Sequence, residues 1–117
     1  MPLRILLIDD NARVRATLAE MLITLGHSVR AAPGGREGLA YLEAGHSVDV
    51  VLTDLKMPQM SGWQVVQAVK ARWPALRVGV ITGTPEALGE QREPVDLVLT
   101  KPISLEGLRA AISREDS

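Results

Sequence analysis

The sequence predicts an α/β fold in which a parallel sheet is doubly wound, with helices on both faces. Short continuous apolar runs, typical of strands buried on both faces, alternate with stretches whose apolar residues repeat at helical spacing. The 117 residues are 46% hydrophobic and 23% charged, which indicates a single globular domain rather than a disordered chain. We expect residues 1–113 to form this domain and residues 114–117 to be a polar tail or the start of a linker.

Composition excludes several classes of protein. The absence of cysteine excludes disulfide scaffolds, thiolate metal sites and cysteine nucleophiles. The net charge of −1 leaves no basic excess for binding a phosphate backbone. No apolar run reaches the ~20 residues that span a membrane, and the amino terminus lacks the pattern of a signal peptide. We therefore expect a cytoplasmic protein that neither binds nucleic acid directly nor inserts into a membrane.

The first half of the chain predicts two strands and two helices. Residues 4–8 have the pattern of a buried strand, and residues 28–31 that of a short edge strand. Asp9-Asp10-Asn11 offers capping residues for a helix that stops at Gly26, and a shorter helix stops at Gly45. The apolar residues on the inner faces of these helices are Val14, Leu18, Met21, Leu22, Leu25, Leu39 and Leu42.

The second half predicts three strands, at residues 48–53, 77–82 and 97–100, and three helices. Ser61 and Gln64 have the spacing of a capping box, which begins a helix that must stop before Pro74. A weakly apolar helix is expected at residues 85–91, and Ser104 can cap a last helix. The expected inner residues of the two stronger helices are Val65, Val66, Val69, Leu105, Leu108 and Ile112.

Polar side chains follow the strands at the edge of the sheet where their carboxyl ends meet, which is where ligands bind in such folds. Asp9 and Asp10 follow the first strand, Asp54 ends the strand at 48–53, Thr82 ends the next, and Lys101 follows the last. Carboxylates without histidine or cysteine favour a hard cation, Mg²⁺ above all. One carboxylate could also attack a phosphoryl group, whose oxygens the metal, the hydroxyl and the ammonium would hold.

Together these motifs make the sequence resemble the receiver domain of two-component response regulators. The matching segments are Ile5–Asn11, Val48–Pro58, Met60–Gly62, Val80–Gly83 and Leu99–Ile103, and they follow the family's order over nearly the whole chain. The resemblance implies a flavodoxin-like sheet of five parallel strands with about five helices.

The resemblance also implies a role for each residue at that edge. Asp54 would accept a phosphoryl group from a sensor histidine kinase or a histidine phosphotransfer protein. Asp10, Asp9 through water, Asp54 and the backbone carbonyl of Lys56 would bind Mg²⁺, and Thr82 and Lys101 would contact the phosphoryl group. The domain would be no enzyme beyond catalysing its own phosphorylation and dephosphorylation, and the family allows a weak homodimer.

Two further features follow from the resemblance. The Lys101–Pro102 peptide would be cis, as proline permits. Partners would dock on the first helix and the loop after the last strand, where we expect Ala12, Val14, Arg15 and Ile103 to contribute.

The sequence departs from the family in three places: at Val98, at Gly83 and in the compact segment between Thr82 and Lys101, whose expected helix is weak. Val98 replaces the usual aromatic residue, and Gly83 replaces the usual alanine after the threonine. Val98 is short and β-branched, so the coupled movement of ring and threonine cannot occur in its usual form. We therefore expect phosphorylation to alter mainly residues 82–84 and the Lys101 loop. One alternative is accordingly an interaction module that needs no phosphorylation, and another is a relay or phosphate sink.

Two enzymatic or cofactor alternatives are weaker. An aspartate-nucleophile phosphatase places its second acid two positions after the nucleophile, whereas Asp9 and Asp10 are adjacent, and we expect no cap domain for a substrate. A flavin site would need a Ser/Thr-rich phosphate loop after the first strand, and Gly34-Gly35 carries no phosphate-binding pattern. We expect His27 and His46 to lie away from the site, and Trp63 and Trp73 to pack or lie half-exposed.

Overall fold

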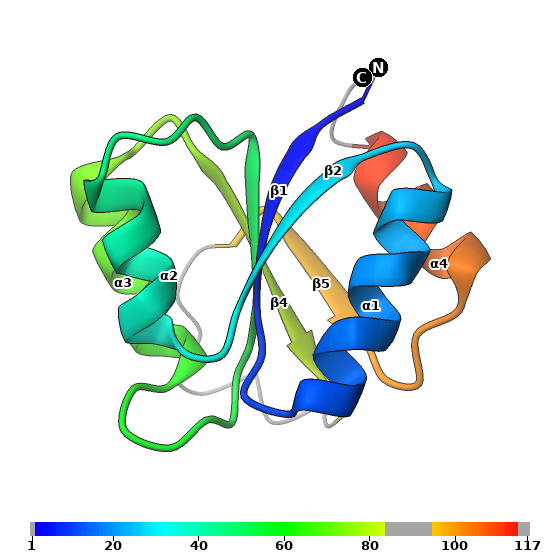
Figure 1. Cartoon of the computed structure of the whole chain (residues 1–117), viewed down its shortest axis with the longest axis horizontal. Coiled ribbons are helices and arrows are strands. Elements are labelled where there is room, and N and C mark those ends of the chain that lie inside the picture. The colour runs from blue at the N-terminus through cyan, green and yellow to red at the C-terminus, as the bar shows by residue number, and fades with distance from the viewer. Residues whose placement is uncertain (1, 84–94, 115–117) are drawn as a thin grey trace.

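A computed structural model describes residues 2–83 and 95–114 of the chain. The strands form one parallel sheet of five strands in the order β2-β1-β3-β4-β5 (Figure 1). The elements are β1 (Arg4–Ile8), α1 (Ala12–Thr24), β2 (Ser28–Ala32), α2 (Gly35–Glu43), β3 (Val50–Asp54), α3 (Gly62–Arg72), β4 (Arg77–Thr82), β5 (Leu97–Thr100) and α4 (Leu105–Arg114). This strand order is the flavodoxin-like one, so the predicted fold class is confirmed. The helix expected at 85–91 lies outside the described residues.

Helices cover both faces of the sheet, α1 and α4 on one side and α2 and α3 on the other (Figure 1). Strand side chains alternate between the two layers, as the pleat requires. Ile5 and Leu7 of β1 pack in the α1/α4 layer, while Leu6 and Ile8 pack in the α2/α3 layer. All four side chains are buried, which explains why this strand has a continuous apolar sequence.

The predicted helix ends are present. The Asn11 side chain accepts a hydrogen bond from the Val14 N–H at 3.0 Å and caps α1. Ser61 and Gln64 form a reciprocal capping box at the start of α3. Gly26 follows α1 with a φ of 98°, a left-handed conformation that glycine adopts without steric cost.

The third strand begins at Val50, two residues later than predicted. Asp49 is held by Arg4: its Oδ2 accepts from the Arg4 backbone N–H at 2.7 Å, and its own N–H donates to the Arg4 carbonyl at 2.8 Å. Because the Arg4 N–H is bonded to a side chain, the regular ladder begins with the next pair, Ile5 and Val50.

The expectation that Leu105 is an inner residue of the last helix is wrong, because 41% of this residue is exposed. The buried face of α4 is formed by Leu108, Ala111 and Ile112. At 100° per residue, Leu105 lies about 60° from Leu108 around the helix, on the side away from Ala111. It therefore falls at the margin of the buried face.

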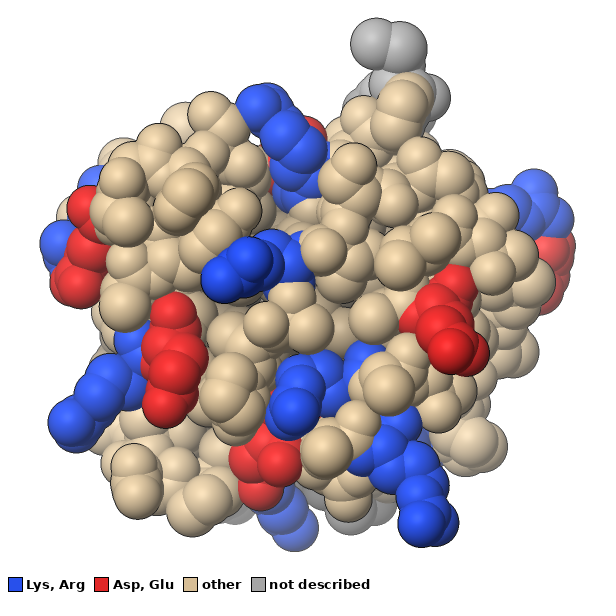
Figure 2. All heavy atoms as spheres, in the orientation of Figure 1, with Lys and Arg blue, Asp and Glu red and all other residues tan. Residues whose placement is uncertain are grey.

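Charges of both signs are interspersed on the face that Figure 2 shows, where Lys and Arg side chains alternate with Asp and Glu. Within residues 2–83 and 95–114, no helix is both long and apolar enough to cross a membrane.

Candidate functional site

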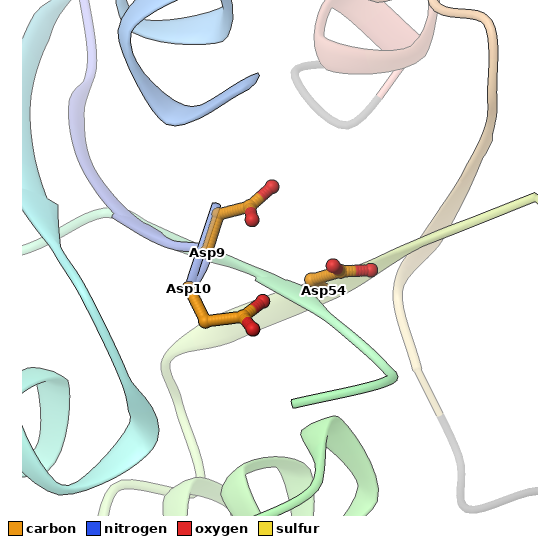
Figure 3. A group of neighbouring side chains, drawn as sticks. All are labelled: Asp9, Asp10 and Asp54. Carbon is orange, nitrogen blue, oxygen red and sulfur yellow. The ribbon is translucent and has the colours of Figure 1, made fainter. Parts of the chain in front are cut away.

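The acidic side chains converge because of the strand register. Ile8 of β1 pairs with Thr53 of β3, so Asp9 and Asp54 come one residue later on neighbouring parallel strands. Asp10 follows directly on the turn into α1. One carboxylate oxygen from each of the three residues lies within 4.8 Å of the others, and Figure 3 shows the three side chains extending into the same space. The predicted acidic cluster is therefore present at the carboxyl edge of the sheet.

Asp9 is the most buried member of the cluster, with none of its surface exposed. Its Oδ1 accepts from the Asn11 N–H at 2.9 Å, whereas its buried Oδ2 has no hydrogen-bond partner within residues 2–83 and 95–114. Burial raises the pKa of the Asp9 carboxyl group; the Asn11 N–H opposes this shift, Asp54 reinforces it, and Lys101 lowers the pKa again. A buried carboxylate with one oxygen unbonded among the described residues, in a group of three carboxylates, is suited to a divalent cation.

Asp54 lies between the acidic pair and a cation. Only 8% of the residue is exposed. Its Oδ1 accepts from the Leu55 N–H at 2.9 Å, and its Oδ2 lies 3.4 Å from Lys101 Nζ. Its backbone carbonyl accepts from Thr53 Oγ1 at 2.9 Å. The carboxylate is thus oriented from both sides, with the ammonium group of Lys101 at one oxygen.

Thr82 and Lys101 are brought to the same edge by β4 and β5. Asp54 pairs with Ile81, the residue before Thr82, and Thr82 is 5% exposed. The Lys101 N–H donates to the Thr82 carbonyl at 2.8 Å, and the Lys101–Pro102 peptide is cis, as predicted. Lys56 lies two residues after Asp54 with an exposed side chain. A hydroxyl and an ammonium group therefore reach the edge that carries the carboxylates.

Two contributors to this edge were not predicted. Arg15 extends back from α1, and its Nη1 donates to the Asp9 carbonyl at 2.8 Å. Gly62 brings the start of α3 against Asp54, and its N–H donates to the Leu55 carbonyl at 2.9 Å. The sequence held a signal for each of these two contributors. Arg15 lies on the helix that follows the acidic pair, and Gly62 is a glycine within a capping box.

A largely apolar hollow of about 300 Å³ lies between α1 and the loop after β5. It contains Val14 and Ile103, both expected at the docking surface. Ala12 and Arg15 do not line it, and Arg13 is the arginine at its edge, because the Arg15 guanidinium turns toward Asp9. The other lining residues are Thr17, Leu18, Met21, Lys101 and Pro102.

The two histidines lie away from the acidic cluster, and the two tryptophans pack against one helical layer. His27 Nδ1 accepts from the Leu3 N–H at 3.0 Å, beside the start of β1. His46 stacks on Tyr41, with ring centroids 4.1 Å apart, in the loop before β3. Trp63 and Trp73 are half-buried against the α2/α3 layer. Both histidines therefore lie at the opposite edge of the sheet from Asp54.

Val98 is half-buried and packs against the α2/α3 layer, paired with Val80 of β4. A Cβ atom added at Gly83 would meet no atom of residues 2–83 and 95–114 within 4 Å. Both positions at which the sequence departs from the family pattern thus carry small residues close to the end of β4.

Comparisons with known proteins agree with this geometry. A family model described as "Response regulator receiver domain" matches residues 5–113. The transcriptional regulatory protein GlrR of Escherichia coli K12 is 33% identical over 114 residues, which cover 95% of this chain and 26% of GlrR. The sensor histidine kinase RcsC of the same strain is 32% identical, over 93% of this chain and 12% of RcsC. This chain thus spans a minor part of both relatives.

A response regulator receiver domain protein from Clostridium thermocellum has a similar solved structure. The TM-score is 0.84 at 30% identity, and the match covers 97% of each chain. With the strand order, the acidic cluster at the carboxyl edge and the nearby lysine, these matches lead to one conclusion: the chain belongs to the response regulator receiver domain family.

Proposed function

We propose that this receiver domain, residues 1–113, accepts a phosphoryl group on Asp54 from a phosphohistidine of a sensor histidine kinase or a histidine phosphotransfer protein. The observation that carries the proposal is the placement of the Asp54 carboxylate. It lies at the end of a central strand, within 4.8 Å of two other carboxylates and 3.4 Å from an ammonium nitrogen. Neither Asp9 nor Asp10 has a comparable ion pair among the described residues.

Residues of this chain supply the nucleophile for the transfer step and the groups that stabilise the transferred phosphoryl group. An oxygen of Asp54 forms the new O–P bond while the P–N bond of the phosphohistidine breaks and its electron pair returns to the imidazole nitrogen. The Lys101 ammonium then offsets the negative charge on the phosphoryl oxygens, and the Thr82 hydroxyl donates a hydrogen bond to one of them. Strands β4 and β5 bring both residues to this edge, where the Lys101 N–H donates to the Thr82 carbonyl.

The same residues fit Mg²⁺. Asp9, Asp10 and Asp54 supply only carboxylate oxygens, which hard cations prefer, and the backbone carbonyl of Lys56, two residues after Asp54, would add another oxygen donor. The Oδ2 of Asp9, which no described residue bonds, supports this assignment, because a cation would provide an interaction for it. When bound, Mg²⁺ would neutralise carboxylate charge and polarise a phosphoryl oxygen.

Mass spectrometry after incubation with acetyl phosphate and Mg²⁺ tests the acceptor. We expect the protein to gain one phosphoryl mass and Asp54→Asn to gain none. Asp49→Asn is the matched control, because Asp49 belongs to the opposite edge of the sheet and is bonded to Arg4. Undiminished labelling of Asp54→Asn would refute the assignment.

The hollow between α1 and the β5–α4 loop supports the proposed partner. It lies beside Lys101, which contacts Asp54, so a helix seated there would bring a phosphohistidine close to the acceptor. Its apolar lining, with Arg13 at the rim, suits an amphipathic helix that carries acidic residues. We expect Arg13→Glu with Ile103→Ser to slow transfer from a kinase identified by phosphotransfer profiling. Labelling of the same variant by acetyl phosphate should persist. Equal losses in kinase transfer and in acetyl phosphate labelling would show that the substitutions damage the site around Asp54 rather than the docking surface.

A relay or phosphate-sink role is the second candidate. Val98 has no ring to rotate, and it packs against Val80 within the α2/α3 layer. Partner proteins would then recognise the phosphorylated state through surfaces close to Asp54. A further phosphohistidine protein that removes the group from Asp54 faster than hydrolysis does would support this role.

A further inference from the structure

One side chain outside the proposed phosphoryl and metal ligands contacts the acidic cluster. Arg15 lies in the first turns of α1 and is half-buried. Its Nη1 donates to the backbone carbonyl of Asp9 at 2.8 Å, and its own backbone N–H donates to the Asn11 carbonyl at 2.9 Å. The residue therefore ties the start of the helix to the acidic turn from which it emerges.

Asp9 is held at three points. Its N–H donates to the Ala32 carbonyl of β2 at 3.1 Å, and its Oδ1 accepts from the Asn11 N–H. The Arg15 guanidinium holds its carbonyl. Regular pairing of β1 ends at Ile8, so this last contact restrains the peptide between Asp9 and Asp10, the residues whose side chains converge on Asp54.

The restraint matters because the carboxylates repel one another. One oxygen of each of the three carboxylates lies within 4.8 Å of the others. Electrostatic repulsion therefore favours movements of the turn that increase the distances between them. A hydrogen bond from a charged donor is stronger than one between neutral groups, and the planar guanidinium loses little freedom in making it. We infer that Arg15 is a positioning residue that keeps the Asp9–Asp10 turn in the geometry that binds a divalent cation. This inference rests on the proposed function of the same site.

A positioning contact and a mere neighbouring charge have opposite effects on Mg²⁺ affinity. A guanidinium near carboxylates also repels a cation, so removal of the charge alone would strengthen Mg²⁺ binding. Removal of a positioning contact would weaken it, and outer-shell contacts of metal sites typically contribute about 10- to 100-fold in affinity. The sign of the change therefore distinguishes a positioning residue from a mere neighbouring charge.

The experiment is a Mg²⁺ titration of the whole chain by calorimetry. We expect Arg15→Met to weaken Mg²⁺ binding about tenfold. Arg15→Lys, which keeps a charged donor of similar reach, should retain most of the affinity. Arg36→Met is the matched control, because this exposed arginine begins α2 at the same edge of the sheet. Binding by Arg15→Met that equals or exceeds that of the unmutated chain would overturn the inference.

Hydrogen exchange of the metal-free protein separates this inference from the proposed function. The Asn11 amide is bonded to Asp9 Oδ1, so it reports whether the turn is held. We expect faster exchange at Asn11 in Arg15→Met and unchanged exchange in Arg15→Lys and Arg36→Met. Unchanged exchange in Arg15→Met would refute the restraint. If the unmutated chain binds no Mg²⁺, the metal part of the proposed function fails, and the exchange comparison still decides whether Arg15 holds the turn.

Discussion

Substitution of Gly62 by alanine should couple a loss of stability to a loss of phosphoryl acceptance. Gly62 is the first residue of α3, and its N–H is bonded to the Leu55 carbonyl. A Cβ atom at this position would lie 2.2 Å from the Asp54 backbone oxygen and 2.7 Å from Leu55 Cα. Since both obstructing atoms belong to the backbone, no side-chain rotation can relieve the contact.

The geometry sets the size of the effect. An ordinary contact begins near 3.4 Å, so the start of α3 and the end of β3 must separate by about 1.2 Å. Overpacking of this kind costs about 1–3 kcal/mol, and more where only the backbone can yield. At about 4 °C per kcal/mol for a domain of this size, we expect the Tm to fall by roughly 4–12 °C.

Thermal unfolding and acetyl phosphate labelling measure the two consequences on the same sample. The displaced segment carries Asp54, so labelling at a temperature where the variant is folded should also slow. Gly83→Ala is the control: its Cβ would meet no atom of the described residues within 4 Å, and we expect its Tm to stay equal or rise slightly. A Gly62→Ala protein with an unchanged Tm would show that the close approach to Asp54 does not constrain the fold.

Three further predictions concern the acidic cluster and output. Removal of Mg²⁺ should lower the Tm of the unmutated protein, whereas Asp10→Ala should show little response to Mg²⁺ and equal or higher stability without it; a Tm indifferent to Mg²⁺ in the unmutated protein would count against the site. Burial raises the pKa of Asp9, so the folded state holds the Asp9 proton to a higher pH than the unfolded state does. The stability of the fold therefore falls as the pH rises from 3.8 through the raised pKa of Asp9. Asp9→Asn should therefore raise the Tm of metal-free protein at pH 7, and the gain should shrink as the pH falls toward 3.8; a gain independent of pH would refute the burial argument. Beryllofluoride, a phosphoryl mimic, should change hydrogen exchange near Thr82 and Lys101 but little across Leu97–Thr100, and strong protection of that strand would show that a full switch operates with Val98.

Much of the fold and of the candidate site could be predicted from the sequence, because the relevant signals are local. Four consecutive apolar and buried positions at 5–8 require a strand covered on both faces, and the spacing of Ser61 and Gln64 places the start of α3. Parallel strands bring their carboxyl ends to one edge, so residues that follow different strands had to converge there. The acidic cluster and its neighbour Lys101 were therefore predictable without knowledge of any contact.

Tertiary structure decided what depends on which partner a side chain meets. Arg15 has the spacing of a surface helix residue, yet its guanidinium bonds the Asp9 carbonyl instead of lining the docking hollow. Asp49 has the pattern of a strand residue, but its bonds to Arg4 delay the start of β3. Leu105 has helical periodicity with Leu108 but lies at the margin of the buried face. Periodicity shows which residues share a face, whereas burial and bonding depend on segments far apart in the chain, whose distances only the packed sheet and helices define.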